Sequence, residues 1–142
     1  MSTTSVRIDQ VGTVFVPVTD QERSLSFYVE KLGFEKRADF SYGGGRWLEV
    51  APPGSAHRVA LVPLNEGKGD SGKRTYCAFE TRSVDETNAA LRKAGVEVSE
   101  IARKGSKRSG LFSDAVGIPD PVPPQFFFRD PDENQFLIVQ TG

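Results

Sequence analysis

Two stretches of this chain follow the same plan, and that repeat constrains the fold more than any other feature of the sequence. Residues 14–34 and residues 77–96 each contain a short apolar strand, a polar helix cap, an amphipathic helix and a terminal glycine. Glycine is a common helix terminator because it adopts the left-handed cap conformation without steric cost. The same plan in both halves of one chain indicates an internal duplication.

The first copy begins with valines that alternate from position 14 to position 18, which predicts a strand. Thr19 and Glu22 have the spacing of a capping box, in which a hydroxyl and a carboxylate satisfy free amides of the first helical turn. Apolar residues then recur at helical spacing: Leu25, Tyr28, Val29 and Leu32. We therefore expect a helix of about three turns that Gly33 ends.

The second copy has the same signals in the same order. Ser83 and Glu86 form the second capping box, and Gly95 closes the second helix. The buried face of this helix is predicted from a further set of residues: Val84, Thr87, Leu91 and Ala94. Three more strands are predicted in each half, over 34–40, 47–50 and 58–62 in the first and over 96–102, 126–128 and 135–140 in the second. Each half therefore reads as strand, helix and three strands.

These patterns predict one domain over residues 1–142 with an α+β fold. We place the first βαβββ module at 11–64, a linker at 65–74 and the second module at 75–142. The stretch 104–125 is rich in Gly, Ser, Asp and Pro and has no periodicity. A loop of this length in a small domain is often a lid or a binding loop.

The composition excludes several classes of protein. The chain is 37% hydrophobic and 26% charged, and its apolar runs are too short to cross a bilayer, so we expect no membrane association. The first ten residues lack the apolar core of a secretion signal, which favours a cytoplasmic protein. The net charge of -1 provides no general attraction for nucleic acid. Cys77 is the single cysteine, and its position within a predicted strand indicates a buried, unreactive thiol.

Three motifs in order resemble the vicinal oxygen chelate superfamily, which includes glyoxalase I, the extradiol dioxygenases and the bleomycin-resistance proteins. The motifs are PVTDQERSLSFYVEKLGF, AFETRSVDETNAALRKAGV and FFFRDPDENQFLIV, and the resemblance extends over residues 11–140. It implies two βαβββ modules whose mixed sheets curl around a cleft. It also implies binding of a small molecule and a homodimer, which agrees with the tendency of open sheet edges to pair.

The resemblance also tests whether the cleft holds a metal. The positions that carry metal ligands in metal-binding members fall here on Thr13, Leu61, Tyr76 and Leu137. Two of these side chains are alkyl groups, one is a phenol and one is a neutral hydroxyl, which together do not bind Zn, Ni or Fe. We therefore expect no metal and no other cofactor.

Two other candidate sites follow from the residue types. His57, the single histidine, lies in a predicted hairpin loop, and Glu49 lies across that hairpin, so a metal site made from both is one alternative to a plain loop histidine. Asp130, Asp132 and Glu133 resemble a calcium loop in charge alone. We interpret this acidic run as a turn in which Pro131 restrains the backbone and Asp130 acts as the cap.

Without a metal, the expected cleft is an apolar, aromatic-lined pocket with a few polar groups, which is typical of sites for small molecules. Its predicted ligand-binding residues are Thr13, Phe15, Trp47, Glu49, Leu61, Tyr76, Phe128 and Leu137. Arg74 is a further polar candidate, and the catalytic residues are unassigned.

Three functions are compatible with these residues. The first is a metal-independent protein that sequesters an aromatic or antibiotic-like molecule. The second is a lyase, isomerase or dioxygenase of the glyoxalase type with a non-standard site, in which Glu49 or Tyr76 acts as general acid or base. The third is a dimeric accessory domain that binds no ligand. The missing metal ligands disfavour the metal enzymes, but they do not distinguish a binder from a metal-free enzyme.

Overall fold

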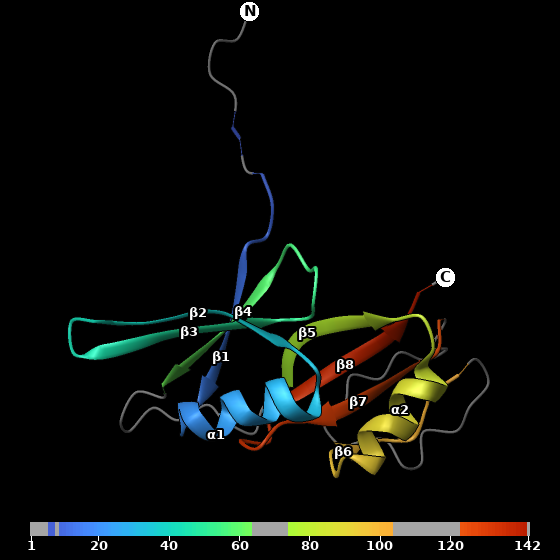
Figure 1. Cartoon of the computed structure of the whole chain (residues 1–142). Helices are drawn as coiled ribbons and strands as arrows, with labels where there is room; N and C mark the ends of the chain where they lie inside the picture. Colours follow the sequence, from blue (N-terminus) through green and yellow to red (C-terminus); the bar gives the residue numbers. More distant parts are fainter. Residues whose placement is uncertain (1–5, 8, 64–73, 104–122, 142) are drawn as a thin grey trace, which may run out of the picture.

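A computed structural model of the chain describes residues 6, 7, 9–63, 74–103 and 123–141 (Figure 1). The first half contains β1 (Thr13–Val18), α1 (Gln21–Ser26), the π-helical turn η1 (Phe27–Lys31), β2 (Glu35–Tyr42), β3 (Gly45–Ala51) and β4 (Arg58–Pro63). The second half contains β5 (Arg74–Thr81), α2 (Val84–Lys93), β6 (Glu97–Val98), β7 (Gln125–Arg129) and β8 (Gln135–Gln140). Most of the predicted linker 65–74 and of the predicted lid 104–125 lies outside the described residues.

The strands form two four-stranded mixed sheets with the same topology. The order is β1-β4-β3-β2 in the first sheet and β5-β8-β7-β6 in the second. In each sheet the strand before the helix pairs in parallel with the last strand of its half, and the other pairs are antiparallel. This arrangement confirms the α+β class and the pair of βαβββ modules.

The first helix differs from its prediction at both ends. Its N-cap is Asp20, whose carboxylate accepts the backbone N–H of Arg23 at 3.1 Å, so the expected capping box of Thr19 and Glu22 is wrong. Thr19 instead donates its hydroxyl to Asp132, and Glu22 forms an ion pair with Arg46. The α-helix itself is short and continues as η1.

The second helix follows its prediction more closely. The Ser83 hydroxyl accepts the backbone N–H of Glu86 at 3.2 Å, as an N-cap does. Gly33 and Gly95, at the ends of the two helices, have φ of 76° and 84°, which is the left-handed region that glycine favours. β6 is shorter than the strand predicted at 96–102. The chain after it joins β7 through the backbone N–H of Ser99, which donates to the carbonyl of Phe127 at 2.8 Å, and through a bridge between Ala102 and Gln125.

One hydrophobic core joins the two halves. The inward face of the first sheet contributes Val16, Val18, Leu48, Val50, Val59 and Leu61, and the second sheet contributes Phe126, Phe128, Phe136 and Ile138. Tyr28 of η1 connects the two sets, because its ring lies edge-on to Phe136 with centroids 6.2 Å apart. Figure 1 shows α1 below β2 and β3 of the first sheet and α2 beside the second sheet. Within the described ranges, no helix is long and apolar enough to cross a membrane.

Candidate functional site

The face of the first sheet that points away from α1 carries exposed aromatic side chains. Alternate residues of a strand share a face, and the register places Phe40 directly opposite Trp47 and Tyr42 opposite Gly45. Phe15, Phe40 and Tyr42 are 61%, 55% and 55% exposed. We call Phe15, Phe40, Tyr42 and Trp47 the aromatic face. Such a cluster of exposed rings is unusual on a soluble domain and is typical of an interaction site.

Phe15 and Trp47 form the centre of this face. Their rings come from β1 and β3 and contact each other edge to face, with centroids 5.6 Å apart and planes at 75°. Ala60 of β4 pairs with Phe15 on one side and with Glu49 on the other, and its small side chain leaves space between the neighbouring strands. The rings are therefore held by three strands rather than by a loop.

A buried carboxylate orients the indole. The Nε1–H of Trp47 donates to Oε2 of Glu49 at 3.0 Å, and Nε of Arg58 lies 3.1 Å from Oε1 of the same carboxylate. The side chain of Glu49 is only 11% exposed, whereas that of Arg58 is 39% exposed. Thr13 pairs with Arg58 in the register and so lies beside it on the same face. The carboxylate thus fixes both a ring and a cation at the edge of the aromatic face.

The structure brings together four of the predicted ligand-binding residues, Thr13, Phe15, Trp47 and Glu49, on this face of the first sheet. Leu61 does not join them. It is fully buried in the core because it neighbours Ala60 in the strand and so points to the opposite face, away from the other four.

The other three predicted residues belong to the second sheet. Phe128 is buried and stacks on Phe136 with centroids 5.2 Å apart, so it belongs to the core. Leu137 is half-buried on the opposite face of that sheet, beside Ala78 and Phe127. Tyr76 lies in β5, and its side chain, like that of Arg74, is outside the described part of the structure.

Two cavities lie along β5, away from the aromatic face. The smaller, of about 190 Å³, is lined mainly by apolar side chains that include Phe34, Phe79 and Phe128. The larger, of about 640 Å³, lies between β5 and the first sheet and includes His57, Arg58 and Cys77. Both are lined by Pro52, Phe79 and Glu80, so they adjoin one another. Arg58 borders both the larger cavity and the aromatic face.

The alternative metal site of His57 and Glu49 has no support in the geometry. The exposed ring of His57 contacts the carbonyl of Val11, and Glu49 is held by Trp47 and Arg58. Among the described residues there is no group of three or more His, Cys, Asp or Glu side chains that could hold a metal ion. Burial raises the pKa of the Cys77 thiol to about 11, which makes it a poor nucleophile at neutral pH.

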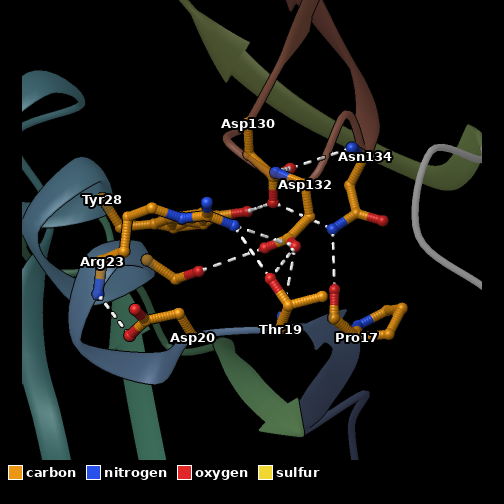
Figure 2. A network of polar contacts seen from close by, with 9 residues as sticks. Pro17, Thr19, Asp20, Arg23, Tyr28, Asp130, Asp132 and Asn134 are labelled. Carbon is orange, nitrogen blue, oxygen red and sulfur yellow. Dashed lines mark hydrogen bonds and ion pairs between the residues drawn. The ribbon is translucent and has the colours of Figure 1, made fainter. Parts of the chain in front are cut away.

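The acidic run at the tip of the β7–β8 hairpin has a structural role (Figure 2). Asp130 accepts the backbone N–H groups of Asp132 and Asn134 at 2.9 and 2.8 Å, as expected of the residue that caps this turn. It also accepts the hydroxyl of Tyr28 at 2.8 Å, a contact between the two halves that the sequence pattern did not reveal. Burial raises the pKa of Asp130, although hydrogen bonds from Asn134 and Tyr28 act in the opposite direction.

Sequence reasoning missed three residues near the site. Phe40 and Tyr42 belong to a strand with a highly charged beginning, and only the hairpin register places their rings beside Trp47. Arg58 stands at the start of a predicted strand, and the alternation through Arg58, Ala60 and Val62 is a signal that all three share one face.

Comparison with known proteins agrees with this fold. Residues 7–138 match the family described as the Glyoxalase/Bleomycin resistance protein/Dioxygenase superfamily. The chain is 32% identical over 134 residues to the uncharacterized protein YetH of Bacillus subtilis (strain 168), covering 94% of this chain and 99% of YetH.

Two solved structures are also similar. TnmS3, an antibiotic binding protein from Streptomyces sp. CB03234, is 31% identical with a TM-score of 0.75, covering 97% of this chain and 100% of that one. A superfamily member from Sphaerobacter thermophilus DSM 20745 is 31% identical with a TM-score of 0.74, covering 94% and 98%. This chain therefore belongs to the Glyoxalase/Bleomycin resistance protein/Dioxygenase superfamily.

Proposed function

We propose that this protein is a metal-independent binder that sequesters a flat, partly aromatic molecule on the aromatic face. The observation that carries the proposal is the contact of exposed Phe15 with half-buried Trp47, whose indole is fixed by buried Glu49. An exposed apolar ring gains free energy when a ligand covers it, at about 25 cal/mol per Å² of apolar surface removed from water.

The rigidity of this pair supports binding of a small molecule. Phe15 and Trp47 lie within paired strands, and the indole has its N–H already bonded, so little side-chain freedom remains for a ligand to remove. Preorganised groups of this kind raise affinity by lowering the entropy lost on binding. The similarity to TnmS3, an antibiotic binding protein, supports sequestration of an antibiotic-like ligand rather than turnover.

The side chains at the ligand positions support the absence of a metal. Thr13, Leu61 and Leu137 have neither an imidazole nor a carboxylate, which are the groups that bind transition metals in such sites. Leu61 also points away from the aromatic face.

We further propose that the chain forms a homodimer. The aromatic face has three exposed rings, and Val6 and Val11 before β1 are also 85% and 66% exposed; exposed apolar side chains gathered in this way are typical of an interface. Size-exclusion chromatography with light scattering measures the mass directly, and a mass of one chain at all concentrations contradicts the dimer.

The single tryptophan permits a direct test of ligand binding. Trp47 is the one source of an indole N–H signal in a ¹H–¹⁵N spectrum, and that N–H lies in the proposed site. We expect 2-naphthylmethanol and quinoline to shift this signal in a saturable way, and cyclohexylmethanol to leave it unchanged. Phe15→Ala should weaken the binding of 2-naphthylmethanol by about tenfold, since it removes one wall of the site.

The controls distinguish binding at the aromatic face from nonspecific hydrophobic binding elsewhere on the protein. Val6→Ala removes exposed apolar surface away from the aromatic face and should leave the affinity unchanged. Addition of EDTA, Zn²⁺ or Mn²⁺ should not alter the affinity. The proposal would be contradicted if no aromatic compound shifted the indole signal of Trp47, or if binding required one of these metals.

A further inference from the structure

We infer that Arg58 makes the aromatic face selective for aromatic molecules that carry an anionic oxygen, such as a carboxylate or a phenolate. The inference rests on the proposed function of this face. It follows from a difference between the two charged side chains of the site: Glu49 is nearly buried between its partners, whereas Arg58 is partly exposed.

Glu49 is nearly buried and already has a partner at each of its two oxygens. One oxygen accepts the indole N–H of Trp47 at 3.0 Å, the other lies 3.1 Å from Arg58, and the side chain is only 11% exposed. A cationic ligand would have to displace one of these partners and open the packing around the carboxylate. Removing a partner from a buried charge is strongly unfavourable, so the site disfavours cations.

Arg58 is in the opposite situation. Its side chain is 39% exposed, and its contact with Glu49 is made through Nε without the alignment of a hydrogen bond. Across the described ranges, Glu49 is the acidic partner of this guanidinium, and no oxygen is hydrogen-bonded to Nη1 or Nη2. Because arginine keeps its charge at all physiological pH values, these terminal N–H groups are permanent, unused donors for an anion.

The location of Arg58 permits a ligand to use the rings and the guanidinium together. Phe15 pairs with Ala60, and Arg58 lies two residues before Ala60 on the same face, so Arg58 is a diagonal neighbour of Phe15 across the two strands. A fused ring on Phe15 and Trp47 can therefore direct an acidic substituent toward Arg58, whose side chain is partly open to solvent.

A series of ligands that differ only in charge tests this inference. The compounds are naphthalene-2-carboxylate, 2-naphthylmethanol and 2-naphthylmethylammonium, each titrated while the indole signal of Trp47 is followed. We expect the carboxylate to bind on the order of tenfold more tightly than the alcohol, as a charged hydrogen bond to a partly exposed group predicts. The ammonium compound should bind most weakly, and the preference for the carboxylate should decrease at high salt.

Three variants assign the preference to one side chain. Arg58→Gln should reduce carboxylate binding to the level of the alcohol and leave alcohol binding unchanged, whereas Arg58→Lys should retain part of the preference. Arg46→Gln is the matched control, because it removes one positive charge from the opposite face of the sheet, where Arg46 pairs with Asp39 and Glu22. The control should bind all three compounds as the wild type does.

The outcomes separate this inference from the proposed function. If carboxylate and alcohol shift the indole signal with equal affinity, or if Arg58→Gln keeps the preference, the selection by Arg58 is wrong while the binding function stands. The inference about Arg58 is also wrong if Arg58→Gln does not fold and the preference of Arg58→Lys for the carboxylate does not decrease at high salt. If none of the three compounds shifts the signal, both proposals fail together.

Discussion

Tyr28 shows how one hydroxyl can connect two halves of a chain. Its ring is fully buried in the core, and its O–H donates to Asp130 at 2.8 Å, a residue that lies 102 positions later. Burial, followed by the negative charge of Asp130, raises the pKa of Tyr28 well above its ordinary value. The hydroxyl therefore stays protonated at neutral pH and remains a donor.

Tyr28→Phe should lower the free energy of unfolding by about 2 kcal/mol, because a buried carboxylate loses a donor while the ring packing is kept. Urea denaturation followed by circular dichroism measures the change. The control is Tyr42→Phe, which removes the hydroxyl of an exposed tyrosine on the aromatic face and should alter stability by less than about 0.5 kcal/mol. Equal effects from both variants would show that the Tyr28 hydroxyl has no special role.

The β7–β8 hairpin depends on one carboxylate at its turn. Asp130 accepts two backbone N–H groups, the amide of Asn134 at 3.0 Å and the hydroxyl of Tyr28. Four donors around one group hold the turn in a single conformation and allow Glu133 to adopt a φ of 63°. The aromatic strands on either side are thereby aligned for the core.

The raised pKa of Asp130 predicts a pH dependence for this element. Since the folded protein binds the Asp130 proton more tightly than the unfolded chain does, stability from this group is greatest below the unfolded pKa of 3.8 and is lost as pH rises through the folded pKa. Asp130→Asn removes this contribution. We expect the stability of the wild type relative to Asp130→Asn to fall as pH rises above 3.8.

Urea denaturation of both proteins at a series of pH values tests that expectation. A relative stability that is constant with pH, or that rises with it, would contradict the direction of the Asp130 shift. Glu133→Gln serves as the control, because Glu133 is an exposed acid in the same turn and should not reproduce the effect of Asp130→Asn.

The two halves of the molecule are joined by a second carboxylate beside the first (Figure 2). Asp132 accepts the hydroxyl of Thr19 at 2.6 Å and its backbone N–H at 3.1 Å, and it forms an ion pair with Arg23 at 3.1 Å. Asn134 donates to the carbonyl of Pro17 at 2.8 Å, next to these contacts. The end of β1 and the start of α1 are therefore attached to the β7–β8 turn.

Asp132→Ala should disrupt this attachment and lower the free energy of unfolding by about 3 kcal/mol. Its ion pair contributes only part of the loss, since the side chain of Arg23 is 50% exposed. We also expect the free energy of unfolding to depend less steeply on urea concentration, because the two halves would no longer unfold as one cooperative unit. An unchanged transition would show that the core alone couples the halves.

Most local elements could be predicted from the sequence alone, and the expectation of no metal also comes from the sequence. The alternation in 135–140 and the helical spacing before Gly95 repeat every two to four residues, so they can be recognised within one segment without knowing what it packs against. Thr13, Leu61 and Leu137 have neither an imidazole nor a carboxylate, which is a property of residue type, so the expectation of no metal stays a prediction from the sequence.

Tertiary structure decided which side chains meet. The register between β2 and β3 places Phe40 opposite Trp47. Alternate residues of β4 point to opposite faces, so Arg58 lies on the aromatic face and Leu61 lies in the core. Asp132 lies 113 positions after Thr19 and accepts its hydroxyl, so this hydroxyl does not cap α1 as predicted. Pairing between distant strands depends on the whole packed molecule, and a shift of one residue reverses every face, so local patterns did not reveal these contacts.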